Sequence, residues 1–332
     1  YKLRTLLDMP ACSPMELSII IVNWNSKEYL RRCITSILAG TRGIEFEIIV
    51  IDSASFDGCG EMLQREFPQV QFIQSRENYG FSKSNNLAFQ AASGESVLFL
   101  NPDTEIVGPA INVLHSALKS LPNAGAVGGK LLNTDGTVQT SCIQAFPTIL
   151  NQLFSAEPLR RMFPRSRLWG MSPLFETSTQ PQVVEAISGA CMMLPRKLLQ
   201  NIGVFSEDYF MYAEDIDLAY KISQAGYKCY YVPNATVVHH GGGSSKAASS
   251  NFSSLMVRKS AWRFFRKTRG RYVGLVYRAS MLVSALLRLA LLVVVLPVRL
   301  AQGCRTTWWA SFRKWNAILS WSIRGERPAD DY

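Results

Sequence analysis

Carboxylates and side-chain amides recur in this sequence directly after short apolar runs. They fall in the segments Asn23–Asn25, Asp52–Gly58, Asn78–Phe81 and Asn101–Asp103. Two adjacent acids, Glu214 and Asp215, open a later stretch of helical spacing, and His239 ends the last apolar run. Carboxylate and amide oxygens are hard ligands for divalent cations, and carboxylates also accept protons. The residue types therefore suit a site that holds a cation and moves a proton.

The apolar runs have the composition of buried parallel strands, and stretches of helical spacing separate them. The predicted strands are residues 17–22, 46–51, 70–73 and 96–100, and the predicted helices are residues 27–38, 60–67 and 82–92. This alternation is typical of a doubly wound α/β sheet. Because ligands bind beyond the carboxyl ends of the strands in such sheets, the polar segments are expected at one edge.

The second half of the chain continues with less regular patterns. Further strands are predicted over residues 126–132, over residues 183–194 with a break at 188–190, and through Tyr231 to His239. The acids Glu214 and Asp215 open a helix that is expected to run to about Ala225. Residues 151–180 are loop-like and basic. This segment is interpreted as a mobile lid that covers the acceptor.

The sequence contains neither Gly-x-Gly-x-x-Gly nor Gly-x-x-x-x-Gly-Lys-Ser/Thr. Those motifs are the usual loops that hold dinucleotide and triphosphate groups through backbone N–H donors. A divalent cation bound by oxygen ligands is the simplest other way to hold a diphosphate. The seven cysteines are scattered and never spaced Cys-x-x-Cys, so neither a disulfide framework nor a zinc site is expected, and a reducing setting fits.

In their order along the chain, these motifs resemble the family 2 glycosyltransferases of the GT-A fold, and specifically their rhamnosyltransferase-like branch. The resemblance covers about residues 16–245. It rests on Val22–Asn25, Asp52–Gly58, Asn78–Phe81 with Asn85-Asn86, Leu100–Asp103, Ser188–Ala190, Tyr212–Leu218 and His239–Gly242. It implies a Rossmann-like sheet flanked by helices and a nucleotide-sugar donor.

The resemblance also implies roles for individual residues. The residues expected around the donor are Asn23, Asn25, Asp52, Asp57, Asn78, Gly80, Asn86 and Asn101. Asn101-Pro102-Asp103 stands where the family has Asp-x-Asp, so Asp103 is expected to bind the metal with His239 as a further ligand. Asn101 replaces the first acid of that motif, which removes one negative charge. The cation is expected to be Mg²⁺ or Mn²⁺.

In the pair Glu214-Asp215, the second acid resembles the catalytic base of the family. One base with a cation-stabilised leaving group implies a single displacement with inversion at the anomeric carbon. The implied donor is a dTDP- or UDP-sugar, with rhamnose or another deoxyhexose preferred, and the implied acceptor is a lipid-linked saccharide. The alternatives are a UDP-hexose donor and a noncatalytic relative that binds nucleotides or glycans.

Each of these residues also has a purely structural interpretation. Glu214 and Asp215 could simply complement a helix dipole, and Asp103 after a proline could be a turn residue. Asn23 and Asn25 could cap a helix. His239 alone would more often be structural than a ligand.

The formal net charge of +10 is carried by the C-terminal part of the chain. Residues 1–245 contain 19 basic and 22 acidic side chains, whereas residues 246–332 contain 16 basic and 3 acidic ones. The sequence therefore divides into an extension over residues 1–15, a catalytic domain over 16–245 and a basic tail over 246–332. Met15 is expected to be the natural start.

Within the tail, residues 279–298 are apolar except for Arg288. That length approaches the roughly 20 residues that span a bilayer, yet a central arginine costs about 2.5 kcal/mol or more there. Helices lying in an anionic membrane surface are therefore preferred, at the cytoplasmic face of the inner membrane, in a peripheral or monotopic way. The alternative is a helical cap on the catalytic domain. Nucleic acid is not an expected partner, because the basic residues accompany a long apolar run.

Overall fold

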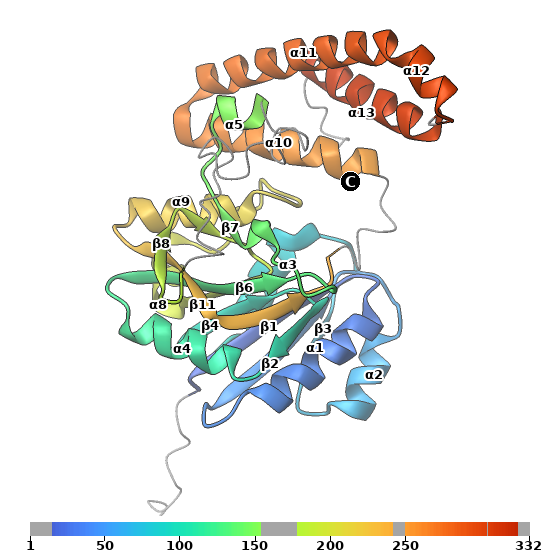
Figure 1. Ribbon diagram of the computed structural model, residues 1–332. Helices are drawn as coiled ribbons and strands as arrows, with labels where there is room; N and C mark the ends of the chain where they lie inside the picture. The colour runs from blue at the N-terminus through green and yellow to red at the C-terminus, as the bar shows by residue number, and fades with distance from the viewer. Residues whose placement is uncertain (1–14, 154–177, 242–249, 304, 325–332) are drawn as a thin grey trace, which may run out of the picture.

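The computed structural model describes residues 15–153, 178–241, 250–303 and 305–324. A mixed sheet with helices on both faces forms the larger part, and four C-terminal helices stack at one end of it (Figure 1). The predicted α/β class is confirmed. The predicted lid and the expected boundary at residue 245 fall largely outside the described residues, although residues 149–153 form a short helix where a loop was expected.

The first half of the chain forms the predicted strand and helix units. The strands are β1 (Leu17–Asn23), β2 (Phe46–Asp52), β3 (Gln71–Gln74) and β4 (Ser96–Leu100), all parallel. The helices are α1 (Lys27–Gly40), α2 (Cys59–Glu66) and α3 (Gly80–Phe89). Their ends differ from the predicted ones by only a few residues, so the carboxyl ends of β1, β2 and β4 meet at one edge as expected.

The second half adds short and partly antiparallel elements. The strands are β5 (Thr104–Val107), β6 (Ala124–Leu132), β7 (Ile143–Gln144), β8 (Gln182–Val184), β9 (Ala186–Ile187), β10 (Cys191–Pro195) and β11 (Lys228–His239). The helices are α4 (Ala110–Ser120), η1 (Thr140–Cys142), α5 (Ile149–Leu153), α8 (Arg196–Ile202) and α9 (Glu214–Gln224). The strand order of the large sheet is β3-β2-β1-β4-β10-β6-β11-β5.

Two strand pairings determine where the second half places its polar residues. Antiparallel β10 sets Cys191 opposite Leu100, so the turn before β10 lies beside Asn101. The Asn101 backbone N–H donates to the Ala190 carbonyl, 3.0 Å away. Antiparallel β11 sets His239 opposite Thr104, next to Asp103. Residues far apart in the sequence therefore reach the edge formed by β1, β2 and β4.

The central strands β1 and β4 are buried on both faces, which explains why they are almost entirely apolar. Leu17, Ile19 and Ile21 pack under α1, α2 and α4, whereas Ile20 and Val22 pack under α3, α8 and α9. Burying each such side chain contributes about 1.5–3 kcal/mol.

The tail forms α10 (Ser250–Arg269), α11 (Arg271–Val294), α12 (Leu296–Ala301) and α13 (Arg305–Arg324). It has a separate core that includes Trp262, Phe265, Tyr277 and Trp315. Among the described helices, α11 is long and apolar enough to cross a membrane by length and composition.

Helix α10 also joins the tail to the α/β part. The Ser260 hydroxyl donates to the Met211 carbonyl (3.0 Å), and Lys267 Nζ lies 3.2 Å from the buried Asp217 carboxylate. The ring of Phe264 packs edge-on against Tyr220 of α9. The tail is therefore docked on the α/β part through side-chain contacts of α10.

Candidate active site

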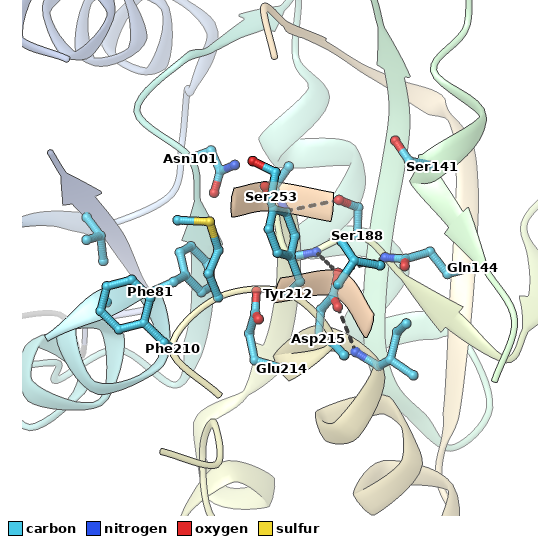
Figure 2. A pocket seen from close by; sticks show the side chains of 18 of the residues that line it. Phe81, Asn101, Ser141, Gln144, Ser188, Phe210, Tyr212, Glu214, Asp215 and Ser253 are labelled. Atoms are coloured by element: carbon cyan, nitrogen blue, oxygen red, sulfur yellow. Dashed lines mark hydrogen bonds between the residues drawn. The ribbon is translucent and has the colours of Figure 1, made fainter. Parts of the chain in front are cut away.

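The carboxyl ends of β1 and β4 open into a cavity of about 660 Å³. Loop residues 210–213 and the first turn of α9 form its second wall, and Ser253, Val257 and Ala261 of α10 form a third. Figure 2 shows Glu214 on the side of Phe210 and Asp215 on the side of Gln144. The predicted site residues that line the cavity are Asn78, Gly80, Asn101, Asp103, Glu214, Asp215 and His239.

Asp215 is held rigidly at the start of α9. Its Oδ2 accepts from the Gly189 N–H (3.0 Å) and from the Gln144 amide (2.7 Å), and its Oδ1 accepts from the Ile216 N–H (2.8 Å). Burial raises its pKa, although those three donors favour the carboxylate and oppose the shift. A buried carboxylate with a raised pKa and a fixed orientation suits a general base.

Glu214 differs from Asp215 in its surroundings. Burial, followed by the charge of Asp215, raises the pKa of Glu214 to about 8. Its Oε2 is buried and has no hydrogen-bond partner among the described residues. Of the two acids, Glu214 therefore holds a proton at neutral pH, which leaves the negative charge on Asp215.

Strained backbone precedes these acids. Tyr212 and Ala213 have φ angles of 70° and 63°, in the left-handed region that residues other than glycine rarely adopt. Such strain costs on the order of 1–3 kcal/mol per residue and persists where surrounding structure imposes it. Here it turns the chain so that α9 begins with both carboxyl groups at the cavity.

His239 is oriented by Gln139 on the far side of its ring. The Gln139 amide donates to the His239 carbonyl (2.7 Å), so its oxygen accepts from His239 Nδ1 (2.9 Å). Nδ1 therefore carries a hydrogen. The other ring nitrogen, Nε2, lies 3.3 Å from Asp103 Oδ1 and 3.3 Å from the Asn101 amide nitrogen.

This arrangement fits a divalent cation. When the imidazole is neutral, the Nε2 lone pair and the Asp103 carboxylate are two acceptors that face each other, and a shared cation satisfies both. A hydrogen bond from the opposite ring nitrogen is the usual support for a metal-binding histidine. Asp103 and His239 are therefore the residues that would hold the ion.

Beneath the cavity, buried polar residues tie the ends of β1 and β2 together. The Asn23 amide donates to Asp52 (2.8 Å), which also accepts from Ser55 and Gln74. Burial alone would raise the pKa of Asp52, but these hydrogen bonds outweigh it and lower that pKa. Asp57 accepts the N–H of Lys27 at the start of α1 (2.9 Å). Asn23, Asp52 and Asp57 thus form one network, although none of them lines the cavity.

The remaining predicted donor residues divide into two groups. Asn78 lines the cavity and accepts from the Gly80 N–H (3.0 Å). Gly80 has a φ of 73°, and a Cβ there would lie 2.5 Å from the Phe210 carbonyl oxygen, so glycine is required for this close approach. Asn25 is exposed outside the cavity, and Asn86 bonds the backbone of Phe205 (2.9 Å) away from it. The structure does not place Asn25 and Asn86 beside the predicted site residues that line the cavity.

A further set of acceptors, Asp52, Asp57 and Cys59, lies within 4.8 Å of one another. Both carboxylates already accept backbone N–H groups, from Ser55 at Asp52 and from Lys27 at Asp57. Burial, followed by the two nearby carboxylates, raises the pKa of the Cys59 thiol, which favours the protonated sulfur. This set fits a hydrogen-bonded scaffold better than a cation site.

Sequence reasoning missed Gln139 and Gln144, which orient His239 and Asp215. Both follow β6 in a segment without regular periodicity, Gln139 directly before η1 and Gln144 within β7, so no sequence signal indicated them. It also missed that α10 lines the cavity.

A mixed sheet flanked by helices, with polar residues gathered at the carboxyl edge of its parallel strands, agrees with the expected GT-A fold. The sequence matches Glycosyl transferase family 2 over residues 18–203 and Glycosyl transferase family group 2 over residues 155–323. The chain belongs to glycosyl transferase family 2 and is a glycosyltransferase, as the resemblance predicted.

Three relatives illustrate the similarity. The chain is 28% identical over 243 residues to the N-acetylglucosaminyl-diphospho-decaprenol L-rhamnosyltransferase of Mycobacterium tuberculosis, covering 67% of this chain and 75% of that one. It is 23% identical over 230 residues to Rhamnosyltransferase WbbL of Escherichia coli, covering 67% and 82%. The structure of the mannosyltransferase PcManGT from Pyrobaculum calidifontis, solved with GDP-Man and Mn²⁺, matches with a TM-score of 0.58 at 17% identity, covering 95% and 88%. The GT-A fold is thereby confirmed.

Proposed function

We propose that the protein transfers rhamnose or a similar deoxyhexose from a nucleoside-diphosphate donor to a lipid-linked saccharide, with inversion. The observation that carries this proposal is that Asp215 and the pair Asp103 and His239 line one cavity. The names of the relatives support the sugar and the acceptor, since one is a rhamnosyltransferase acting on N-acetylglucosaminyl-diphospho-decaprenol.

Asp215 is the proposed base. Its carboxylate accepts the proton of the acceptor hydroxyl as the new glycosidic bond forms, a contribution of about 10²–10⁴ in rate. The Gly189 N–H and the Gln144 amide keep this carboxylate aimed into the cavity. One proton acceptor on the acceptor side is all that a single displacement requires, which is why inversion is expected.

Asp103 and His239 are the proposed ligands of a Mg²⁺ or Mn²⁺ ion. When bound, such an ion neutralises the charge that develops on the leaving diphosphate. The Asn101 amide nitrogen lies 3.3 Å from the same ring nitrogen of His239, where the family motif has an acid, so a bound cation would replace this amide contact at Nε2. A donor from the dTDP- or UDP-sugars is proposed.

The proposed place of action is the cytoplasmic face of the membrane, with the tail lying on the bilayer. Leu287, Leu291 and Val294 of α11 are 66%, 59% and 73% exposed. Arg278 of α11 donates to the Ser322 carbonyl of α13 (2.9 Å). Because contacts of this kind tie α11 to the rest of the tail, an interfacial position is favoured over a span.

The test is a transfer assay with the full chain. It combines dTDP-rhamnose, UDP-hexoses or GDP-mannose with a synthetic polyprenyl-diphosphate N-acetylglucosamine and Mg²⁺ or Mn²⁺. We expect one disaccharide product by mass spectrometry, with an anomeric configuration opposite to that of the donor by NMR. Absence of a product with every donor, from protein that binds nucleotide, would contradict the proposal in favour of a noncatalytic relative.

A further inference from the structure

Three cationic side chains gather around one indole ring in the tail. The guanidinium of Arg288 lies 4.3 Å from the centre of the Trp315 ring, that of Arg258 lies 5.4 Å away, and the Lys314 ammonium lies 5.7 Å away. They come from α11, α10 and α13. The helices therefore converge to place three positive charges about one rigid ring.

These charges have no carboxylate partner among the described residues. Arg258 donates to the Ser254 carbonyl (2.8 Å) and Arg288 to the Leu153 carbonyl (3.1 Å), which are neutral acceptors. Within the part of the chain that the structure describes, the buried Nε of Arg258 has no hydrogen-bond partner. Partly buried charges are normally paired, and carbonyl groups and one indole face neutralise none of the charge.

The electrostatic surroundings agree with this geometry. Burial lowers the pKa of Arg258, and burial followed by the charge of Arg258 lowers that of Arg288. Burial lowers the pKa of Lys314, and the two guanidinium groups lower it further. The three cations repel one another, so the folded tail keeps a concentrated positive potential that an anion would relieve.

The cluster adjoins residues that line the cavity and exposed apolar residues of α11. Gln152 and Val257 line the cavity. The residue after Gln152 is Leu153, whose carbonyl accepts from Arg288, and the residue after Val257 is Arg258 of the cluster. On α11, apolar side chains near Arg288 are exposed; they are Val283, Leu286, Leu287 and Leu291. In Figure 1, α5 lies beside α10 and α11 at this junction.

We propose that Arg258, Arg288 and Lys314 bind the diphosphate of the lipid-linked acceptor. This inference rests on the proposed function, because it assigns the subsite for the acceptor of the same reaction. The saccharide then extends into the cavity and the lipid chain follows the apolar face of α11. The order of cavity, cations and apolar surface matches the order of sugar, diphosphate and hydrocarbon in such a molecule.

The chemistry of the cluster favours phosphate oxygens. Guanidinium groups bind phosphate in a bidentate way, and their stacking on Trp315 fixes their planes before the ligand arrives. Three positive charges match a diphosphate diester better than the single charge of a phospholipid headgroup, although the oxygen chemistry is shared.

The test is a binding titration that needs no turnover. The full chain in detergent is titrated with geranylgeranyl diphosphate in the presence of a chelator, so that a cation at Asp103 does not retain the diphosphate. Arg258→Gln, Arg288→Gln and Lys314→Gln are compared with Arg313→Gln, an exposed arginine beside Lys314. Each cluster variant is expected to weaken binding about tenfold, whereas the control stays within about twofold.

Three outcomes overturn the inference. Geranylgeraniol binding as tightly as the diphosphate shows that the lipid chain alone is recognised. Equal losses in Arg313→Gln and Arg288→Gln show general attraction to a charged surface. If the cluster variants lose affinity for phosphatidylglycerol vesicles but bind geranylgeranyl diphosphate normally, the cluster binds membrane headgroups instead. A circular dichroism melt shows whether Arg258→Gln folds. If it does not, the variants of the half-buried Arg288 and Lys314 still test whether the cluster binds the diphosphate.

A kinetic arm separates this subsite from the catalytic groups. With a polyprenyl-diphosphate acceptor, Arg288→Gln is expected to raise the acceptor KM about tenfold and leave kcat unchanged. With an alkyl glycoside of the same sugar, which lacks the diphosphate, KM should be unchanged as well. If the wild-type chain transfers no sugar to either acceptor, the proposed function fails, and the titration still decides on the cation cluster.

Discussion

His239 Nε2 lies 3.3 Å from Asp103 Oδ1, and the pairing of β11 with β5 brings these distant residues together. The opposite ring nitrogen is held 2.9 Å from the Gln139 amide oxygen. A carboxylate and an oriented imidazole at this edge of the sheet are suitable ligands for a divalent cation, and the proposed metal site can be tested directly.

Replacing a proposed metal ligand should weaken cation binding without unfolding the protein. We expect His239→Ala and Asp103→Asn each to raise the Mn²⁺ concentration needed for half-maximal transfer at least about 10-fold. Gln139→Ala should raise it about 10–100-fold by releasing the ring. Manganese titrations of activity and of thermal protection by nucleotide measure this. His240→Ala is the matched control, because His240 bonds Glu105 (2.7 Å) instead, and an equal effect there would count against His239.

The two acids at the start of α9 should differ in kinetics. Asp215→Asn keeps the shape of the side chain but cannot accept the proton, so kcat should fall about 10²–10⁴-fold with donor affinity retained. Glu214→Gln, which mimics the protonated acid, should keep most of the activity at pH 7. Steady-state kinetics on both variants decide the assignment. A larger kcat loss in Glu214→Gln would transfer the role of base to Glu214.

The pH dependence of activity follows from the raised pKa of Asp215. The base must be a carboxylate, so kcat/KM is expected to fall as the pH drops through the pKa of Asp215, which burial raises from its ordinary value. Gln144→Ala removes a donor that favours the carboxylate, so it should move this acid limb to higher pH. Rate profiles between pH 4 and 9 measure the shift. An acid limb that stays in place would show that Gln144 does not act on Asp215.

Much of this site could be predicted from the sequence, because central parallel strands are buried on both faces of the sheet and therefore stand out as apolar runs. Their apolar runs allowed β1, β2 and β4 to be recognised, and the polar residues after these strands had to meet at one edge. The insertion of antiparallel β10 between β4 and β6 could not be predicted, since strand order depends on packing across the whole sheet. For the same reason, no pattern of residues indicated that Gln144 reaches Asp215 or that Val257 lines the cavity.

Glu214 should make stability depend on pH. Its pKa is raised from 4.5 to about 8, so the folded state binds this proton more tightly than the unfolded chain. The resulting stabilisation is complete below the unfolded pKa and is lost as the pH rises through 8. Glu214→Gln keeps a neutral side chain, so at pH 9 it should be more stable than the wild type by about 1–3 kcal/mol. Urea unfolding at pH 5, 7 and 9 measures this, and a gap that is the same at all three values would refute the burial argument.

The exposed apolar face of α11 should control membrane binding. Leu287 and Leu291 are 66% and 59% exposed, and burying a leucine in a bilayer surface contributes about 1.5–3 kcal/mol. Leu287→Ser and Leu291→Ser should therefore each lower affinity for phosphatidylglycerol vesicles about tenfold or more in sedimentation assays. Val183→Ser, on β8 away from the tail and 53% exposed, is the control. If α11 instead crossed the bilayer, single polar replacements would leave the protein in the membrane through alkaline carbonate extraction. A bilayer-surface position predicts release of both variants and thereby separates the two arrangements.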